Sequence, residues 1–337
     1  MKKLISVLAL VLSLVMILGL VGCAGAKEPI SDEKPQESYT AIDMTVACLK
    51  GPTGVGMAKL MEDSANGKTA NNYTFTVASA ADEISGKIVK GEINIAAVPT
   101  NLAAKLNTKT EGKIKMLAVN TLGVLSILEN GESIKSVADL KGKTIYSTGE
   151  GSNPEYILRY ILSENGIDPD KDVTLQFIAT NDELISALVS GKAQVAMVPE
   201  PAATTVLTKK DTLRRAISMN DEWEKLGDSS LMMGCLVALD SFVEANKEQV
   251  DKFLEEYKAS VDYANNSIDD AAELCAKYEI VAAAPIAKQA IPYCNLTYVS
   301  GSEMKNSIVG YFEVLKGYDA TSIGGALPDD SFYYGAE

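Results

Sequence analysis

A segment of 18 residues near the start of the chain returns in altered form 100 positions later. Residues 82–99 read DEISGKIVKGEINIAAVP, and residues 182–199 read DELISALVSGKAQVAMVP. Seven of the 18 positions are identical at this offset, and they include Gly91 with Gly191 and the final Val-Pro of both segments. Either two unrelated helix–strand units share the need for a glycine turn, or one chain is built as two similar α/β lobes. We favour the second interpretation.

Each copy lies inside a repeated order of strands and helices. In the first copy, Asp82 and Glu83 suit a helix N-terminus, Gly91 ends the helix, and residues 93–98 form a buried strand. The segments around both copies follow the same order. Further strands are expected at 44–49, 73–78, 114–119, 143–147 and 173–178. Strands that alternate with helices predict mostly parallel sheets that are covered on both faces.

The pattern changes after Trp223, which we expect to pack near a hinge. Residues 231–239 form one apolar run, and the motif Ser241-x-x-Glu244 predicts the cap of a long helix that reaches Tyr263. Only helical segments are expected after that point. One strand followed by helices cannot build a third domain, so we expect the chain to return to its first lobe. The expected division is 43–120 plus 233–337 for lobe 1, 136–225 for lobe 2, and hinge crossings at 121–135 and 226–232.

The first 42 residues fit neither lobe. The chain begins with MKK, continues with an apolar run over residues 4–21, and reaches Leu-Val-Gly-Cys at residues 20–23. This order resembles a secretory signal peptide (residues 1–22) that ends in the lipobox of bacterial lipoproteins, which implies lipidation of Cys23. An uncleaved transmembrane helix is the alternative. Residues 23–42 are mostly polar and are expected to form a tether between the membrane and the folded domain.

Charge and composition argue against several kinds of site. The formal net charge is −14, and it becomes −16 once Lys2 and Lys3 leave with the signal peptide. Nucleic-acid binding relies on neutralising phosphates with Lys and Arg, so this acidic chain is not expected to bind nucleic acid. Histidine and the CxxC pattern are absent, and we expect neither a metal nor a cofactor. A disulfide between Cys275 and Cys294 is allowed outside the cytoplasm, but spacing alone does not establish its geometry.

Two groups of residues resemble a known family. The first comprises LKGKTI at 140–145, GEGS at 149–152 and LSENGI at 162–167, and the second is GKAQVAMVPEP at 191–201. Together with the lipobox they resemble the extracytoplasmic solute-binding proteins of ABC importers, in the subgroup for taurine, alkanesulfonate, nitrate and thiamine precursors. The resemblance implies a type II periplasmic-binding-protein fold, an α/β fold with two mostly parallel-sheet lobes joined by a two-crossing hinge. Ala202 stands where this subgroup often has an aromatic residue, which weakens the transfer of a particular ligand.

Polar residues gather in the loops that follow the expected strands. In open α/β sheets, ligands bind at the carboxyl ends of the strands, where helix N-termini present free N–H groups. The candidates for holding a solute are Thr53, Gly54, Ser79, Thr100, Asn101, Thr148, Gly151, Ser152, Asn153, Asn181 and Glu200. The motifs Ser152-x-x-Glu155 and Thr180-x-x-Glu183 also fit capping boxes, so helix capping alone is the alternative for Ser152 and Thr180.

Glu200 marks the point where the two copies stop matching, because its counterpart is the neutral Thr100. Its carboxylate can stabilise the N-terminus of the next helix through the macrodipole, or it can recognise an amine, amidine or hydroxyl group of the solute. Both interpretations remain open. The chain has three arginines and none lies in these loops, so a small oxyanion would be held by backbone amides and hydroxyl groups.

The resemblance implies a lipid-anchored, extracytoplasmic and monomeric receptor. Its lobes would close around a small organic solute, either a sulfonate-like anion or a heterocycle, and the closed form would dock on a membrane permease. An enzyme on the same fold is one alternative, but the absence of histidine removes the usual general base. A surface sensor or adhesion module that binds a protein partner is the other. We expect the receptor, and not an enzyme.

Overall fold

The computed structural model describes residues 39–227 and 229–336. The expected signal peptide and the lipidation site at Cys23 lie outside these ranges. Residues 41–337 form one compact unit. None of the helices within the described ranges is long and apolar enough to cross a membrane.

A six-stranded sheet is the centre of the first lobe. Its strands stand in the order β11-β4-β10-β3-β1-β2. They are β1 (Asp43–Leu49), β2 (Asn72–Ala78), β3 (Ile95–Pro99), β4 (Ile114–Thr121), β10 (Gly234–Leu239) and β11 (Leu296–Val299). β1 pairs with β2 and β3 in parallel, whereas β10 runs antiparallel to β3 and β4, and β11 runs antiparallel to β4.

A five-stranded sheet is the centre of the second lobe, with the order β7-β6-β8-β5-β9. Its strands are β5 (Leu125–Asn130), β6 (Thr144–Ser147), β7 (Thr174–Phe177), β8 (Val195–Pro199) and β9 (Leu213–Ser218). β6 pairs with β7 and β8 in parallel, and β5 runs antiparallel to β8 and β9.

The two sheets share one topology. The order β2-β1-β3-β10-β4 in the first lobe corresponds to β7-β6-β8-β5-β9 in the second, with parallel and antiparallel pairs in the same places. β3 and β8 end the two copies of the repeated segment and occupy equivalent positions, so the prediction of two similar lobes is confirmed. The sheets are mixed, however, and not mostly parallel as expected. The reason is that β10 and β5 each enter their sheet from the other lobe and run against their neighbours.

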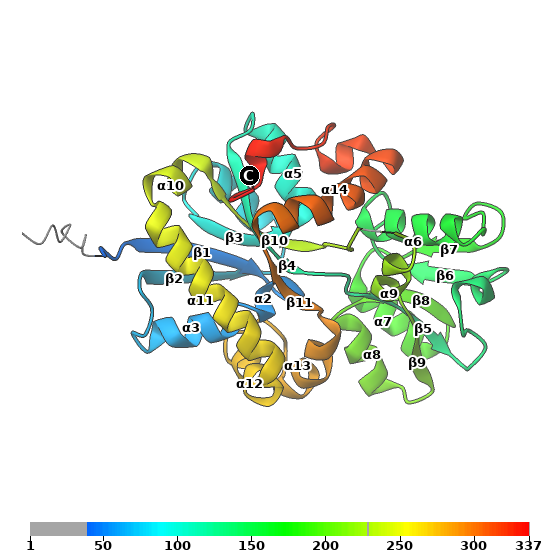
Figure 1. Ribbon diagram of the computed structural model, residues 1–337. Coiled ribbons are helices and arrows are strands. Elements are labelled where there is room, and N and C mark those ends of the chain that lie inside the picture. Colours follow the sequence, from blue (N-terminus) through cyan, green and yellow to red (C-terminus); the bar gives the residue numbers. More distant parts are fainter. Residues whose placement is uncertain (1–38, 228, 337) are drawn as a thin grey trace, which may run out of the picture. The chain divides into compact units, whose positions relative to one another are not determined.

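Helices cover both faces of each sheet (Figure 1). In the first lobe α3, α11, α12 and α13 pack on one face, and α4, α5 and α14 pack on the other. In the second lobe α6 and α9 cover one face, and α7 and α8 cover the other. The helices are α2 (Pro52–Val55), α3 (Ala58–Ala65), α4 (Asp82–Val89), α5 (Thr100–Lys109), α6 (Asn153–Glu164), α7 (Asn181–Ser190), α8 (Ala202–Lys209), α9 (Met219–Glu224), α10 (Asp240–Ala245), α11 (Lys247–Asn266), α12 (Ile268–Lys277), α13 (Ala284–Ala290) and α14 (Gly301–Tyr318).

The C-terminal part differs from the expected run of helices. The strand β11 follows α13 and pairs with β4 at the edge of the first sheet. The expected long helix is divided at Asn246, whose φ of −136° and ψ of 39° are not helical, into α10 and α11. α10 begins at Asp240 without a side-chain cap, so the cap predicted for Ser241 is wrong. The strand and helices nevertheless return to the first lobe, as the sequence predicted.

The chain passes between the lobes twice, at residues 122–124 and, among the described residues, at 225–227 and 229–233. The first crossing is shorter than the expected 121–135, because β5 already belongs to the second sheet. Gly123 lies in the first crossing, where its amide donates to Asn220 Oδ1 at 3.1 Å and its carbonyl accepts from Asn295 Nδ2 at 2.5 Å. A Cβ atom built on Gly123 would lie 2.7 Å from Leu231 Cδ2, so the crossings leave no room for a side chain.

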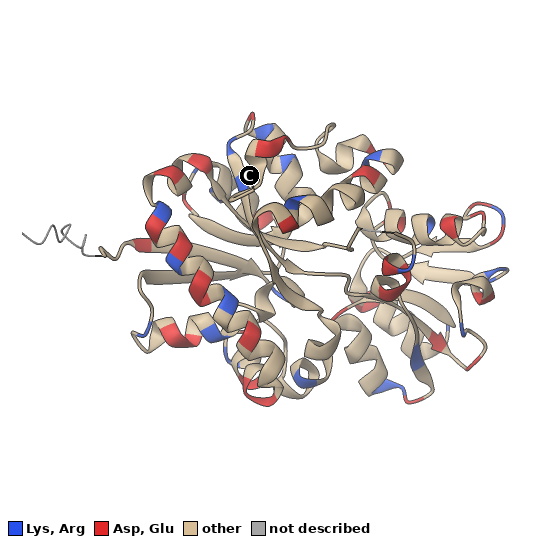
Figure 2. Ribbon diagram, in the orientation of Figure 1, with Lys and Arg blue, Asp and Glu red and all other residues tan. Residues whose placement is uncertain are grey.

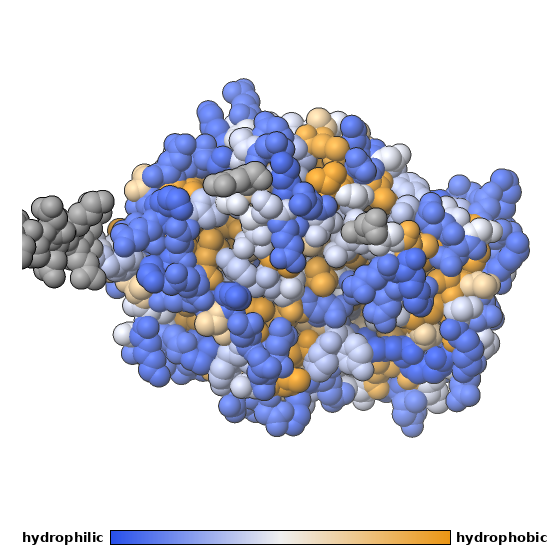
Figure 3. All heavy atoms as spheres, in the orientation of Figure 1, coloured by the Kyte–Doolittle hydropathy of each residue, from blue (hydrophilic) through white to orange (hydrophobic). Residues whose placement is uncertain are grey.

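Charged residues lie mainly on the outer helices and loops, while the strands contain few of them (Figure 2). Polar residues likewise cover most of the face that Figure 3 shows. The strands β3 and β8, which lead to Thr100 and Glu200, are buried on both faces over Ile95–Val98 and Val195–Val198. Burial of continuous apolar strands under helices on both sides supplies the main stabilisation of such lobes.

Candidate functional site

The strand-end loops of the two lobes meet across the boundary between them. Gly51 follows β1 with a φ of 92°, which favours glycine. A Cβ atom built on Gly51 would lie 3.5 Å from Pro201 Cδ, a residue of the loop after β8. The loops after β1 and β8, two of those that were expected to hold a solute, therefore lie close to each other in space.

A chain of hydrogen bonds connects two of these loops, those after β3 and β6, with α14 and the second crossing. Asn153 Nδ2, at the first turn of α6 in the second lobe, donates to Tyr311 Oη on α14 of the first lobe at 3.0 Å. Tyr311 also hydrogen-bonds the Thr100 side chain at the start of α5. Thr100 Oγ1 in turn donates to the Met232 carbonyl oxygen in the second crossing at 2.7 Å. Burial raises the pKa of Tyr311 well above its ordinary value, so its hydroxyl keeps its proton.

Aromatic side chains surround this chain of hydrogen bonds. Trp223 packs edge-on against Tyr311 with ring centroids 5.6 Å apart, and it contacts Tyr160 of α6 at 4.8 Å. Its indole nitrogen donates to the Ser229 carbonyl at 3.1 Å, in the second crossing. Trp223 therefore packs beside the second crossing, in the region where a hinge was expected. A second contact between α6 and the C-terminal helix joins Tyr156 to Tyr318, whose rings stack at 5.9 Å.

Glu200 lies directly after β8 and is engaged by neighbours in its own lobe. Arg215 Nη1 lies 2.5 Å from its Oε1, and Thr204 Oγ1 donates to its Oε2 at 2.8 Å. The Thr204 amide also points at Oε2, at 3.3 Å, in the first turn of α8. Burial raises the pKa of Glu200, against the opposing effects of Arg215 and Thr204. Glu200 thus occupies the position at a helix N-terminus that the sequence offered as one of its two interpretations.

Arg215 also reaches the first lobe. Its guanidinium lies over the ring of Tyr293, 3.8 Å from the ring centroid, which is the geometry of a cation–π contact. Both residues line a cavity of about 300 Å³ beside the crossings, together with Gly123, Ser126, Asp221 and Asn295. The boundary between the lobes is therefore polar beside this cavity and aromatic around Trp223.

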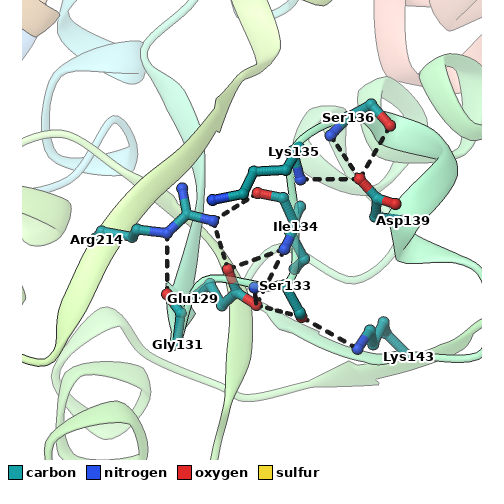
Figure 4. Close-up of polar contacts among 9 residues, drawn as sticks. All are labelled: Glu129, Gly131, Ser133, Ile134, Lys135, Ser136, Asp139, Lys143 and Arg214. Atoms are coloured by element: carbon teal, nitrogen blue, oxygen red, sulfur yellow. Dashed lines mark hydrogen bonds and ion pairs between the residues drawn. The ribbon is translucent and has the colours of Figure 1, made fainter.

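Arg214, the residue before Arg215, anchors the start of β9. It donates to the Glu129 carboxylate at 2.7 Å and to the carbonyl oxygens of Gly131 and Ile134 (Figure 4). Glu129 is buried and also accepts from the backbone amides of Ser133 and Ile134. These contacts fix β9 beside β5 and so set the position of Arg215, which is the next residue along the strand.

The remaining candidates of the second lobe interact locally. Thr148 Oγ1 donates to Asn181 Oδ1 at 3.1 Å, which joins the loops after β6 and β7. Gly151 is exposed with a φ of 64°, and its amide donates to Glu155 Oε2. Ser152 Oγ donates to the Gly149 carbonyl at 2.6 Å, so the capping box predicted for Ser152 is wrong.

The capping box does not form because the Glu155 carboxylate accepts from the Gly151 amide and not from the Ser152 amide. The cap predicted for Thr180 is present, since its hydroxyl accepts from the Glu183 amide.

In the first lobe the candidates differ in exposure. Ser79 is exposed and Asn101 is half-buried at the start of α5. Thr53 is half-buried in α2, and its carbonyl accepts from Asn120 Nδ2 at 3.4 Å. Gly54 is required by packing, because a Cβ atom there would lie 2.4 Å from the Leu49 carbonyl oxygen. The structure thus brings Thr100 and Asn153 together through Tyr311, while within the described part of the chain no hydrogen bond joins Ser79 to the other candidates.

Sequence reasoning did not identify Arg215, Tyr293 or Tyr311. Arg215 contacts Tyr293 of the other lobe, and Tyr311 contacts Asn153 of the other lobe. In each pair the two residues are far apart in the sequence, and no local motif indicates the contact. Cys275 and Cys294, for which a disulfide was left open, are both buried as free thiols.

Comparison with known sequences finds a family model and several relatives that resemble part of the chain. Residues 113–271 match the model of the family described as NMT1/THI5 like. A protein of Brucella abortus (strain 2308), whose name gives it the provisional role of a binding protein, is 24% identical over 167 residues. That match covers 50% of this chain and 50% of the relative, and the same holds for a relative from Brucella suis. The chain therefore spans about half the length of the curated relatives it matches.

Solved structures resemble a much larger part of the chain. The structure of an ABC transporter from Parabacteroides distasonis has a TM-score of 0.73 and 23% identity, and the match covers 86% of this chain and 98% of that one. The periplasmic aliphatic sulphonate-binding protein SsuA from Escherichia coli has a TM-score of 0.70 and 14% identity, over 88% of this chain and 92% of that one. These likenesses confirm the expected periplasmic-binding-protein fold of two lobes.

Proposed function

We propose that this chain, whose central part matches the NMT1/THI5-like family on a periplasmic-binding-protein fold, is the solute-binding component of an ABC importer. It captures a small organic solute between its lobes and delivers it to a membrane permease. The observation that carries this proposal is the hydrogen-bond chain from Asn153 through Tyr311 to Thr100, which joins strand-end residues of both lobes and ends in a crossing. A solute that contacts both lobes stabilises their closed arrangement, because it gains these contacts only there.

The proposed solute is a sulfonate-like anion or a heterocycle. The three arginines are each committed to carboxylates: Arg159 to Glu155 and Asp170, Arg214 to Glu129, and Arg215 to Glu200. An oxyanion would therefore be held by backbone amides and by hydroxyl groups, not by a free guanidinium. The candidates for contact remain Thr53, Gly54, Ser79, Thr100, Asn101, Thr148, Gly151, Ser152, Asn153 and Asn181. Glu200 is proposed to act mainly by positioning Arg215 and α8.

The likeness to the sulphonate-binding protein of Escherichia coli supports this class of solute and the role in transport. The same likeness supports a binding role and not catalysis. The order of residues 1–23 supports export and a lipid anchor at Cys23, which would keep the protein outside the cytoplasm beside its permease. Labelling of cells with a radioactive fatty acid tests the anchor: the wild-type chain should incorporate label, and Cys23→Ser should not.

Thermal unfolding in the presence of a solute library tests the function. A ligand that binds only the folded state stabilises it by an amount that grows with its concentration over its dissociation constant. We expect at least one alkanesulfonate or aminopyrimidine to raise the unfolding temperature, and to be recovered unchanged. Chemical turnover of that compound would favour an enzyme, and a library that leaves the unfolding temperature unchanged would contradict a receptor for these classes.

A further inference from the structure

The two lobes are joined in different ways on the two sides of the crossings. On one side α6 packs against α14, and on the other α8 packs against α13 (Figure 1). On the α6–α14 side a single core of buried apolar side chains continues from one lobe into the other, from Phe312 to Ile157. On the α8–α13 side each lobe has a separate core, represented by Ala203 in the second lobe and Ala287 in the first.

Buried aromatic side chains hold the α6–α14 side together. Tyr311 of α14 and Trp223 of the second lobe are only 0% and 2% exposed, and their ring centroids are 5.6 Å apart. Tyr156 of α6 stacks on Tyr318 of α14, and its hydroxyl donates to Asp319 Oδ2 at 3.2 Å. Separation of the lobes on this side would expose these rings to water, and aromatic side chains contribute some of the largest apolar areas to a core. This side therefore resists opening.

A polar contact crosses the α8–α13 side. The guanidinium of Arg215 lies 3.8 Å from the centroid of the Tyr293 ring, at the end of the short helix that follows α13. Tyr293 is 48% exposed, and the cavity of about 300 Å³ beside the pair has the polar residues Ser126 and Asp221 in its lining. A cation–π contact at an exposed position is weak, because water solvates both partners once they separate. This side therefore opens at much lower cost.

The second lobe alone holds Arg215 in place. Its Nη1 pairs with Glu200, and its Nη2 donates to Thr204 Oγ1 at 2.8 Å. Both partners belong to the same lobe as Arg215, so the guanidinium keeps its orientation when Tyr293 moves away. A group that is already ordered loses little conformational freedom when it makes a new contact. The contact between Arg215 and Tyr293 can therefore form and break without rearrangement of either lobe.

We propose that the lobes separate on the α8–α13 side while they turn about the α6–α14 side, and that the Arg215–Tyr293 contact is a latch across the opening side. The inference rests on the proposed function, because only a receptor whose lobes move needs a latch, and it adds the direction of the movement. A contact of this kind favours the closed form by about two- to fivefold. A bound solute then supplies the remaining preference for closure.

Distances between spin labels test the direction of opening on the purified protein, with no compound added. One labelled pair spans the α8–α13 side, Lys209→Cys with Gln289→Cys, and the other spans the α6–α14 side, Ser163→Cys with Glu313→Cys. All four positions are exposed, whereas the native cysteines within the described ranges are buried. Every protein also carries Cys23→Ser, so that the label attaches to the introduced cysteines. Double electron–electron resonance then gives the populations of open and closed forms.

Three variants test the latch. Tyr293→Leu removes the ring but retains an apolar side chain, and we expect it to raise the ratio of open to closed forms about threefold across the α8–α13 pair. The distance across the α6–α14 pair should not change. Tyr293→Phe keeps the ring and should match the wild type. Tyr318→Leu is the matched control on the other side, since its ring is 40% exposed and the buried contact between Trp223 and Tyr311 remains; it should change neither distance.

The distances also show which part of the account is wrong if one fails. A Tyr293→Leu protein that matches the wild type, or a Tyr293→Phe protein that opens as far as Tyr293→Leu, would overturn the latch. A changed α6–α14 distance in either leucine variant would overturn the direction of opening. These results do not depend on which solute binds. Failure of the proposed function would appear separately, as a solute library that leaves the unfolding temperature unchanged.

Discussion

The guanidinium of Arg215 lies 2.5 Å from the Glu200 carboxylate, and the Glu200 side chain is fully shielded from water. The second carboxylate oxygen of Glu200 accepts hydrogen bonds from the Thr204 hydroxyl and amide. Both oxygens are thus engaged within the second lobe. A direct contact between Glu200 and a solute would require this ion pair to open, whereas its contact with the N-terminus of α8 is already made.

Loss of the Glu200 charge should destabilise the protein strongly. Removal of one partner from a buried ion pair costs about 3–5 kcal/mol, because the other charge remains buried without compensation. We expect Glu200→Gln to lower the free energy of unfolding by about 3 kcal/mol in urea denaturation. The control is Glu255→Gln, which breaks an exposed pair with Lys252 and should cost less than about 1 kcal/mol. Equal effects of the two substitutions would show that the Glu200 pair is not buried.

The stability of the second lobe should depend on pH through Glu129. Burial alone would raise the pKa of Glu129, but hydrogen bonds from Ser133 and Ile134 and the charge of Arg214 outweigh it, and the pKa is lowered. The unfolded value is about 4.3. The stabilisation is therefore fully present above that pH and is lost as the pH falls through the folded pKa.

Urea denaturation of wild type and Glu129→Gln across this range measures the effect. We expect the variant to be less stable at neutral pH and the difference to shrink as the solution is acidified below about pH 4. A difference that is the same at every pH would mean that the Glu129 charge does not contribute.

The packing of the two crossings should not tolerate a methyl group at Gly123. A Cβ atom there would lie 2.7 Å from Leu231 Cδ2 and 2.9 Å from Asn220 Cβ. Overpacking of this kind costs about 1–3 kcal/mol, so Gly123→Ala should lower the unfolding temperature. Gly227→Ala is the matched control, because no heavy atom lies within 4 Å of its added Cβ. Similar unfolding temperatures for both variants would contradict the close packing of the crossings.

The buried cysteines should be unreactive in the folded protein. Burial raises the pKa of Cys48 and Cys275 to about 12, and it raises that of Cys294 as well. The reactive thiolate is therefore scarce at neutral pH. We expect a disulfide-exchange reagent to modify these residues only after unfolding. Intact mass under non-reducing conditions checks the pairing, and a mass two hydrogens lower, assigned by peptide mapping to Cys275 and Cys294, would contradict free thiols.

Much of the fold could be predicted because the repeat is local. The segment from Asp82 to Pro99 contains a complete helix, turn and strand, and the structure places its two copies at equivalent positions as α4–β3 and α7–β8. The antiparallel entry of β5 and β10 could not be predicted in this way. Strand direction in a sheet depends on partners that are distant in sequence, and apolar runs such as Cys235–Ala238 look the same in either direction.

The candidate site, too, could be predicted only where it depends on local sequence. Loops after the strands could be located from glycines and hydroxyl residues, and Thr100 and Asn153 do lie on one hydrogen-bond chain. The residue that joins them is Tyr311, which is 158 positions from Asn153 and sits in an ordinary amphipathic helix. Periodicity identifies such a tyrosine as a core residue and cannot show which lobe its hydroxyl faces.

Closure of the two lobes on a solute is the central claim, and the radius of gyration tests it most directly. Small-angle X-ray scattering should be recorded on the purified protein alone and with a saturating amount of a compound from the solute library that raises its unfolding temperature. A hinged receptor exchanges between open and closed forms, and bound solute shifts that population toward the closed form. We predict a smaller radius of gyration with the compound present. A raised unfolding temperature with an unchanged radius of gyration would contradict capture by closure.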